Sequence, residues 1–212
     1  MSGVHAVVLA AGSARRFGGG KLTAPFRGRP LLLWALDAAL AAAPNATVLV
    51  TGAEAAAVEA VARGAGRGLR IAHAADHAEG LSASLKTGLA ALPPEAEGAM
   101  IFLGDMPGIS AEIPLRLVQA LAVGALAAAP VYEGRRGHPV AFARALFPAL
   151  MSLRGDEGAR RVLEGLGGRL AEIATENLGV LADVDTPADL ARLERGRGEG
   201  ACQDGAIPTP PG

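Results

Sequence analysis

The 212-residue sequence has a single cysteine, Cys202, which excludes an internal disulfide framework and fits a reducing compartment. It also lacks an excess of charge of either sign, because 20 Lys and Arg residues against 21 Asp and Glu residues give a net charge of -1. Electrostatic affinity for nucleic acid or for an anionic membrane is therefore not expected. Any anion that this protein binds must be held by a local arrangement of groups.

The sequence also has no candidate membrane span or export signal. The apolar stretch LLLWALDAALAAA, residues 31–43, is short for a bilayer span and contains Asp37. The first residues lack the basic segment followed by an apolar segment that is typical of secretory signals. We therefore expect a cytoplasmic, soluble protein. Aromatic residues make up only 3% of the chain, and we infer no function from this.

Short apolar runs of strand length alternate with longer segments of helical periodicity. This alternation is typical of βα units and of a parallel sheet covered on both faces. We predict strands at 4–10, 46–52, 69–74, 98–105 and 170–176, and helices at 30–43, 53–66, 82–92, 157–166 and 187–195. Segments 124–134 and 138–147 predict two further strands around a turn at GRRG, the second leading into a helix.

The length of the chain suits one domain with one core, which we place at residues 1–195. Residues 196–212 show no periodicity, and we expect them to form a disordered tail.

The glycine-rich segment LAAGSARRFGGGK, residues 9–21, follows the first predicted strand. Its glycine spacing is not that of the dinucleotide-binding G-x-G-x-x-G motif, and Lys21 is followed by Leu22 where a Walker A loop has Ser or Thr. A tight turn after a strand still presents backbone N–H groups, and Arg15, Arg16 and Lys21 supply positive charge. The residues alone leave open a phosphate-binding loop and a solvated surface turn.

Two aspartates follow apolar segments in LGDMP and ADVDTPADL. Asp105 is either a turn residue or an oxygen ligand for Mg²⁺, which takes one or two carboxylates together with substrate phosphates. Asp185 or Thr186 is a plausible N-cap of the last helix. If Asp185 lies at the same sheet edge as Asp105, the two carboxylates complete a metal site.

Three further segments carry polar groups that suit anion or substrate binding. Gly80, Ser82 and Ser84 open a predicted helix, with Ser82 as its cap, and a helix N-terminus favours anions. The segment YEGRRGHPVAF places Arg135, Arg136 and His138 near a turn, where they are either structural or bind a phosphorylated acceptor. In RGDEGARRVL, acidic and basic residues lie one turn apart, which is also typical of a solvated helix face.

Taken together and in this order, LAAGSARRFGGGK, GLSASLKTGL, LGDMP, RRGHPVAF, RGDEGARRVL and DVDTPADL resemble the motifs of the MobA-like nucleotidyltransferases. The resemblance spans residues 4–193 and is closest to the molybdenum cofactor cytidylyltransferases. It implies a three-layer α/β/α, Rossmann-like fold with a mostly parallel mixed sheet. It also implies a reaction that joins a nucleoside triphosphate to a phosphorylated acceptor and releases pyrophosphate. The resemblance implies molybdopterin as the acceptor. Ala11 stands where guanylyl-transferring relatives have glycine, which favours CTP as the nucleotide.

The resemblance also assigns roles to individual residues. It implies that Arg16, Lys21 and Asp105 are catalytic, and that Asp105 and Asp185 hold Mg²⁺. His138, Asp156 and Arg160 are implied on the acceptor side. The implied nucleotide-binding residues are Leu9, Ala10, Ala11, Gly12, Ser13, Arg16, Lys21, Gly80, Ser82, Ser84 and Asp105.

Other functions remain compatible with these motifs. A related transferase would use GTP, or a sugar or alcohol phosphate as acceptor. A non-catalytic protein would bind a nucleotide or finished cofactor and deliver it, and a divergent member would have a redox role. A molybdoenzyme or its maturation chaperone is the macromolecular partner that the leading hypothesis suggests, with no nucleic acid and no membrane.

Overall fold

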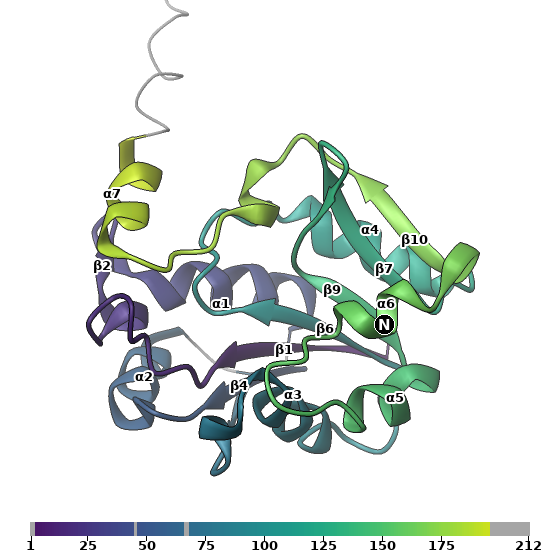
Figure 1. The fold of residues 1–212 in the computed structure, drawn as a ribbon, viewed down its shortest axis with the longest axis horizontal. Coiled ribbons are helices and arrows are strands. Elements are labelled where there is room, and N and C mark those ends of the chain that lie inside the picture. The colour runs from purple at the N-terminus through teal and green to yellow at the C-terminus, as the bar shows by residue number, and fades with distance from the viewer. Residues whose placement is uncertain (1–2, 45, 66–67, 196–212) are drawn as a thin grey trace, which may run out of the picture.

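The central sheet of the protein follows directly from the alternation of apolar strands and helices. A computed structural model describes residues 3–44, 46–65 and 68–195, so the predicted tail at 196–212 lies outside the described residues. Seven strands lie in the order β10-β7-β9-β6-β1-β4-β5, and β8 pairs with β7 (Figure 1). The strands are β1 (Val4–Ala10), β4 (Thr47–Thr51), β5 (Leu69–His73), β6 (Gly98–Leu103), β7 (Ala127–Tyr132), β8 (Arg135–Arg136), β9 (Val140–Ala143) and β10 (Leu170–Ala174).

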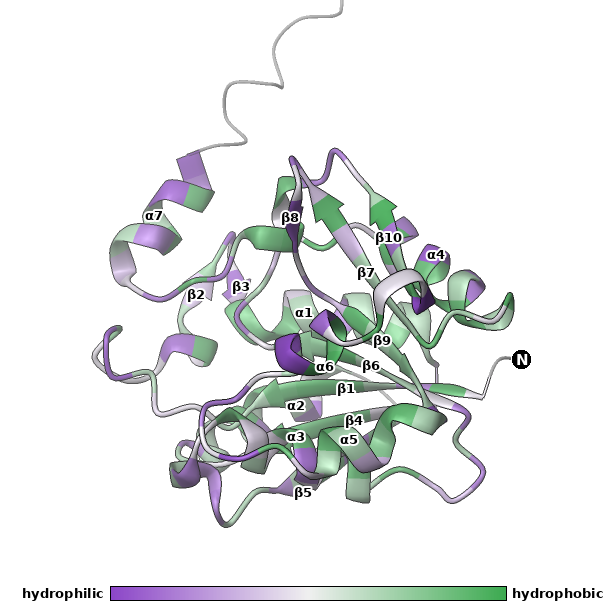
Figure 2. Ribbon diagram, turned by 45° about the vertical axis from the view of Figure 1, so that its right-hand side comes forward, coloured by the Kyte–Doolittle hydropathy of each residue, from purple (hydrophilic) through white to green (hydrophobic). Residues whose placement is uncertain are grey.

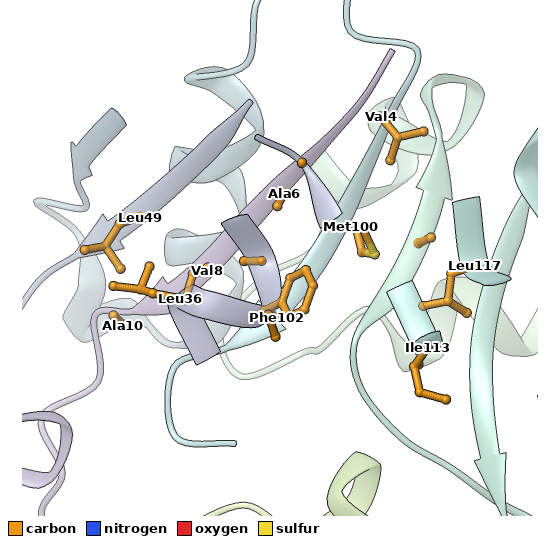
Figure 3. Packing of buried hydrophobic residues seen from close by; sticks show 14 of the residues in the cluster. Val4, Ala6, Val8, Ala10, Leu36, Leu49, Met100, Phe102, Ile113 and Leu117 are labelled. Atoms are coloured by element: carbon orange, nitrogen blue, oxygen red, sulfur yellow. The ribbon is translucent and has the colours of Figure 1, made fainter. Parts of the chain in front are cut away.

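The central strands are almost wholly apolar because the sheet is buried on both faces. Alternate residues of β1 belong to opposite cores: Val8 packs in the first cluster with Leu36, Phe102 and Leu117, while Val7 packs in the second. Figure 3 shows Phe102 and Met100 of β6 in the first of these cores. The period of two along each strand therefore accounts for the two layers that sandwich the sheet.

The helices divide between the two faces of the sheet. Helices α1, α2 and α4 supply buried residues to the first core, and α3, α5 and α6 supply them to the second (Figure 1). The helices are α1 (Leu31–Ala42), α2 (Ala55–Ala62), α3 (Leu81–Ala90), α4 (Glu112–Ala122), α5 (Phe147–Met151), α6 (Arg160–Glu164) and α7 (Pro187–Arg195). Within the described ranges, none of them is long and apolar enough to cross a bilayer.

The topology fixes where a ligand can bind. Strand β1 pairs in parallel with β4 on one side and with β6 on the other, so the direction of winding reverses between β1 and β6. In open α/β sheets, ligands bind outside the carboxyl ends of the strands at such a switch point. Strand β9 is antiparallel to both β6 and β7, so the residues that precede it lie at this same edge.

A small third core lies beside the main sheet. The hairpin of β2 (Pro25–Phe26) and β3 (Arg29–Pro30) packs near α7, as Figure 1 shows. This core buries Phe26, Leu31 and Val184, with Phe17, Trp34, Leu190 and Leu193 packed against it. It connects the glycine-rich loop, through Phe17, to the C-terminal segment around Asp185.

The predicted fold class is confirmed, including the mostly parallel mixed sheet, while some local predictions were wrong. The helix predicted at 157–166 is confined to α6, Arg160–Glu164. Ser82 does not cap α3, because the helix begins at Leu81 after Gly80 and no side chain bonds its first turn. The sequence analysis did not anticipate the β2–β3 hairpin, which spans only two residues in each strand.

Candidate active site

Four charged residues meet at the carboxyl ends of β1 and β6. Lys21 Nζ lies 2.5 Å from Asp105 Oδ2 and 3.9 Å from Asp185 Oδ1. Arg16 donates from one terminal nitrogen to Asp185 Oδ2 at 2.8 Å. These four residues form the charged cluster. They come from the glycine-rich loop, from the turn after β6 and from the segment before α7, so folding brings together the residues that the sequence motifs single out.

Solvent exposure differs sharply within the charged cluster. The Lys21 and Asp105 side chains are 13% and 20% exposed, whereas those of Asp185 and Arg16 are 45% and 79% exposed. Exposed ion pairs contribute little to stability because water competes for both charges. The Arg16–Asp185 pair is therefore readily exchanged for other partners, while the Lys21–Asp105 pair is the one better shielded from water.

The loop that carries Lys21 is shaped by glycine. Gly18, Gly19 and Gly20 all have positive φ, at 90°, 94° and 65°. Residues that carry a Cβ rarely adopt this backbone conformation. The Gly20 N–H donates to Glu54 Oε1 at 2.8 Å, which anchors the loop to the start of α2. Leu22 is buried directly after Lys21. The turn and this anchor together direct Lys21 toward the end of β6.

Asp105 is held by backbone contacts to both neighbouring segments. The Gly104 N–H donates to the Leu9 carbonyl at 2.9 Å, and the Asp105 carbonyl accepts from the Val184 N–H at 3.1 Å. Its carboxylate Oδ1 is buried and has no hydrogen-bond partner. A buried carboxylate oxygen without a partner is costly, so this atom marks a position where a ligand group fits.

The donor set of the charged cluster fits a divalent cation. Two carboxylates, one with an unpartnered buried oxygen, suit a hard cation such as Mg²⁺ or Mn²⁺, which also takes water and phosphate oxygens. Among the described residues, no group of three His, Cys, Asp or Glu side chains gathers to form a metal site from protein ligands alone. A metal held here would therefore share its coordination with a bound substrate.

The first turn of the glycine-rich loop offers backbone donors. Gly12 and Ser13 are exposed, and within the part of the chain that the structure describes their N–H groups have no protein acceptor. Leu9 and Ala10 are instead part of β1, paired with Val50 and Thr51 of β4. The free donors of the predicted cradle are thus concentrated in residues 12–13.

Ala11 is buried, unlike Gly12 and Ser13. Its side chain is 3% exposed, and a Cβ placed on Gly52 would lie 2.7 Å from the Ala11 Cβ. The Ala11 carbonyl accepts from the Ala53 N–H at 3.2 Å. The methyl group of Ala11 therefore sets the spacing between the end of β1 and the loop that follows β4.

The N-terminus of α3 contacts the segment that carries Asp156. Gly80 has φ 113°, and a Cβ there would lie 2.5 Å from the Gly155 carbonyl carbon and 2.6 Å from Asp156 Oδ1. The Ser82 N–H donates to the Gly155 carbonyl at 3.1 Å. Ser82 and Ser84 are both buried. The structure thus joins two motifs that lie more than 70 residues apart in the sequence.

A cavity of about 590 Å³ opens beside the charged cluster. It begins at Leu9 and Leu103, at the ends of β1 and β6, and its apolar wall continues over Leu81, Val140 and Phe142. Its polar lining consists of Arg135, Arg136, His138, Arg160 and Glu172. Figure 2 shows β8 and α6 as hydrophilic segments among the apolar central strands. We call this space the arginine-rimmed cavity.

His138 lies in the wall of this cavity. Its Nδ1 is buried without a hydrogen-bond partner. Burial lowers the pKa of His138 below its ordinary value, and the Ile101 backbone and the charges of Asp105 and Asp183 only partly oppose this shift. The imidazole is therefore neutral near pH 7, with one ring nitrogen available to a ligand.

The remaining acceptor-side candidates are more exposed. Arg160 lines the cavity and pairs with Glu164 at 3.2 Å, while Arg136 pairs with Glu172 at 2.7 Å. Asp156 does not line the cavity and lies against Gly80 instead.

Sequence reasoning missed two carboxylates that organise the site. Glu54 anchors Gly20, and no local pattern marks this contact. Asp189 lies three residues after Thr186. This is the spacing of a capping box, so the sequence pattern could have predicted the contact.

Two known proteins are similar to this chain over most of its length. The chain is 31% identical over 197 residues to the purine catabolism protein PucB of Bacillus subtilis, covering 89% of this chain and 95% of PucB. It is 33% identical over 199 residues to nicotine blue oxidoreductase of Paenarthrobacter nicotinovorans, covering 90% of this chain and 96% of that protein.

A solved structure has the same fold over nearly the whole chain. The Rv0371c protein of Mycobacterium tuberculosis superimposes with a TM-score of 0.80 at 30% identity, covering 92% of this chain and 98% of that one. The same protein has also been solved as a complex with manganese. Residues 6–173 match the model of the MobA-like NTP transferase domain. The predicted family is therefore confirmed, and the chain belongs to the MobA-like NTP transferase domain family.

Proposed function

We propose that this protein transfers CMP from CTP to the phosphate of molybdopterin and releases pyrophosphate, with Mg²⁺ as the divalent cation. The observation that carries the proposal is the unpartnered, buried Oδ1 of Asp105 beside Lys21, next to a cavity large enough for a ring system. A charged cluster, and a cavity with an apolar wall and a polar rim at the same sheet edge, suit a reaction between a triphosphate and a phosphorylated heterocycle.

On the nucleotide side, the backbone of Leu9 to Ser13 cradles the base and triphosphate, with Gly12 and Ser13 as its open N–H donors. Gly80, Ser82 and Ser84 help to hold the nucleotide at the start of α3. Arg16 and Lys21 neutralise the phosphates. In the unliganded protein both cations pair with Asp105 and Asp185, so we propose that they exchange these carboxylates for phosphate oxygens when the nucleotide binds.

The same exchange frees Asp105 and Asp185 to hold Mg²⁺. The bound cation supplies charge neutralisation for the triphosphate and for the developing pyrophosphate. The manganese complex of the mycobacterial relative supports a divalent cation in a protein of this fold.

On the acceptor side, the arginine-rimmed cavity takes the pterin. The neutral His138 forms one hydrogen bond to the ring system, and Arg160 contributes positive charge at the rim. Asp156 acts indirectly, because it lies against Gly80 where the nucleotide and acceptor sides meet.

The reaction needs little covalent help from the protein. An oxygen of the acceptor phosphate forms a bond to the α-phosphorus of CTP, the bond from that phosphorus to the bridging oxygen breaks, and pyrophosphate leaves with both bonding electrons. The acceptor phosphate is already anionic near neutral pH, so no strong general base is required. Positioning and charge stabilisation account for most of the rate enhancement.

Ala11 favours CTP over GTP, because the first motif of the guanylyl-transferring relatives resembles LAGG and has glycine at this position. Its methyl group is packed against the Gly52 segment, so it holds the β1 and β4 ends apart at the entrance of the cradle. Substrates of this kind also favour a cytoplasmic location and delivery of the product to a molybdoenzyme or its chaperone.

A pyrophosphate-release assay tests the proposal. The four nucleoside triphosphates are each combined with molybdopterin, with a sugar phosphate and with an alcohol phosphate, in Mg²⁺ or Mn²⁺. We expect turnover with CTP and molybdopterin to exceed every other pairing by at least tenfold. Preference for GTP would move the protein to the guanylyl branch, and preference for another acceptor would change the substrate class.

Two other outcomes would contradict transferase activity. Tight nucleotide binding without pyrophosphate release in any pairing would indicate a carrier. Because one relative is named an oxidoreductase, NAD(P)H oxidation is followed in the same reactions. Nucleotide-independent oxidation would replace the proposal with a redox function.

A further inference from the structure

Asp185 lies in the irregular segment that joins the short 3₁₀ helix Leu178–Leu181 to α7. It lies beyond residues 6–173, the part of the chain that matches the family domain model. Its side chain is 45% exposed, and its ion-pair partner Arg16 is 79% exposed. Such a pair cannot by itself hold a carboxylate in one position. The backbone around Asp185 must therefore be fixed by other contacts.

Asp189, one turn further along, supplies these contacts. Its Oδ2 accepts from the Asp185 N–H at 3.3 Å, from the Thr186 N–H at 2.8 Å and from the Thr186 hydroxyl at 2.8 Å. The Asp189 N–H donates in return to the Thr186 hydroxyl oxygen at 3.2 Å. This reciprocal arrangement is a capping box that opens α7, with the N–H of Asp185 added to it.

The other side of Asp185 is fixed by Val184. This residue is fully buried in the third core, and its N–H donates to the Asp105 carbonyl at 3.1 Å. Asp185 is thus held on one side by the hydrogen bond from Val184 to the Asp105 carbonyl, and on the other side by the cap of α7. Asp189 Oδ1 is occupied separately, by Arg192 at 2.9 Å.

We propose that Asp189 is a positioning residue: by binding the Asp185 and Thr186 N–H groups, it sets the separation of the Asp185 and Asp105 carboxylates for a divalent cation. The inference rests on the proposed function, in which these two carboxylates hold the cation. Partners that orient metal ligands affect metal affinity about 10- to 100-fold when removed. Under this proposal, helix α7 is part of the active site.

The test compares Asp189→Ala with Arg192→Ala in the full chain. Arg192→Ala removes the outer ion pair of Asp189 and leaves the capping contacts, so it is the matched control. Mn²⁺ binding is measured by electron paramagnetic resonance in the presence of CTP, and kcat and KM are measured separately. Hydrogen exchange of the Asp185 and Thr186 amides is followed in metal-free protein.

For Asp189→Ala we expect Mn²⁺ affinity and kcat to fall about tenfold, with the KM for the acceptor unchanged. The two amides exchange faster, and Arg192→Ala matches the wild type in all of these readouts. Thr186→Val, which removes the hydroxyl from the other half of the capping box, gives the same pattern as Asp189→Ala, whereas Thr186→Ser retains wild-type values.

A double variant separates positioning from general stability. In Asp185→Ala protein, adding Asp189→Ala causes no further loss of kcat or Mn²⁺ affinity if Asp189 acts through Asp185. Independent, additive losses would overturn the inference. Normal Mn²⁺ affinity in Asp189→Ala and Thr186→Val, together with an impaired Asp185→Ala, would overturn it while leaving the proposed function intact. An unimpaired Asp185→Ala would overturn the metal assignment itself.

Discussion

The charged cluster and the arginine-rimmed cavity lie at one edge of the sheet but are lined by different kinds of side chains. The cluster consists of two cations and two carboxylates that already satisfy one another, with one buried oxygen left over. The cavity combines an apolar wall with a polar rim, and its one buried titratable group, among the described residues, is a histidine kept neutral. The first region can exchange charge partners, whereas the second selects by shape and by a few polar contacts.

Under the proposed function, this difference suits the two regions to different parts of the transfer reaction. Phosphates and metal ions are bound by exchange of ion partners, because an incoming ion replaces a group of the same sign and leaves no buried charge unpaired. A ring system is bound by removal of apolar surface from water, with polar groups fixing its orientation. Substitutions in the cluster should therefore alter turnover and metal use, and substitutions in the cavity should alter acceptor binding.

The largest expected effect comes from Asp105. We expect Asp105→Ala to lower turnover by about 10²-fold or more, on the scale of about 3 kcal/mol for one electrostatic contact in the transition state. Steady-state pyrophosphate release in Mg²⁺ measures the effect. Asp183→Ala, an exposed carboxylate on the same segment as Asp185, is the matched control and should retain most activity. Near-normal turnover of Asp105→Ala would remove it from the metal site.

Substitution of Lys21 should have effects of intermediate size, and these should be opposite for the binding of Mn²⁺ and of CTP. Lys21→Ala removes the cation that occupies Asp105 Oδ2, so Mn²⁺ binding without nucleotide should become tighter. The same change removes a charge-assisted contact to the phosphates, so CTP binding should weaken about tenfold. Calorimetric titrations with Mn²⁺ alone and with CTP measure both. Arg16→Ala, in an exposed pair, should change both by less, and equal changes in the same direction would contradict the exchange.

The smallest effect is expected in the cavity, at His138. We expect His138→Gln to raise the KM for the acceptor a few-fold, on the scale of about 1 kcal/mol for one hydrogen bond, and to leave the KM for CTP unchanged. An equal rise in both KM values would place His138 on the nucleotide side and remove the distinction between the two regions.

The same variant should change the dependence of stability on pH. Because the pKa of His138 is lowered in the folded protein, the unfolded chain takes up a proton first as the pH falls. The wild type should therefore lose stability below about pH 6.5, the ordinary histidine pKa, and His138→Gln should lose less over this range. Denaturant unfolding of both proteins at a series of pH values measures the difference. Parallel curves would show that His138 is not the group responsible.

The position of the site was predictable because it follows from chain topology. Lys21 and Asp105 come after strands that lie side by side in parallel, so their carboxyl ends had to meet. Asp185 was predicted at this edge from its motif, although no strand precedes it. The family and fold class were predicted from motifs that occur in the family's order along the chain. Several of these motifs directly follow predicted strands, so they also mark the strand ends of the fold.

Other features could not be read from the sequence because they depend on packing between distant segments. Two hydrogen bonds join loops through single backbone N–H groups, which carry no sequence signature. They run from Gly20 to Glu54 and from Val184 to the Asp105 carbonyl. The contact between Gly80 and Gly155 depends on where α6 begins, and the helix there was predicted too long. The place of β9 depends on pairing with both β6 and β7, which no local pattern marks.

The reversed direction of β9 has a consequence for how proteins of this architecture diversify. Residues 133–139 reverse the chain between β7 and β9 at the carboxyl ends of the parallel strands, with β8 paired to β7, and they supply Arg135, Arg136 and His138 to the arginine-rimmed cavity. Under the proposed function, mutations in these residues would remodel the cavity for the acceptor while the strand ends proposed to bind the triphosphate stay in place. We therefore expect this chain reversal to govern acceptor choice, so that exchanging residues 133–139 between relatives would change the products.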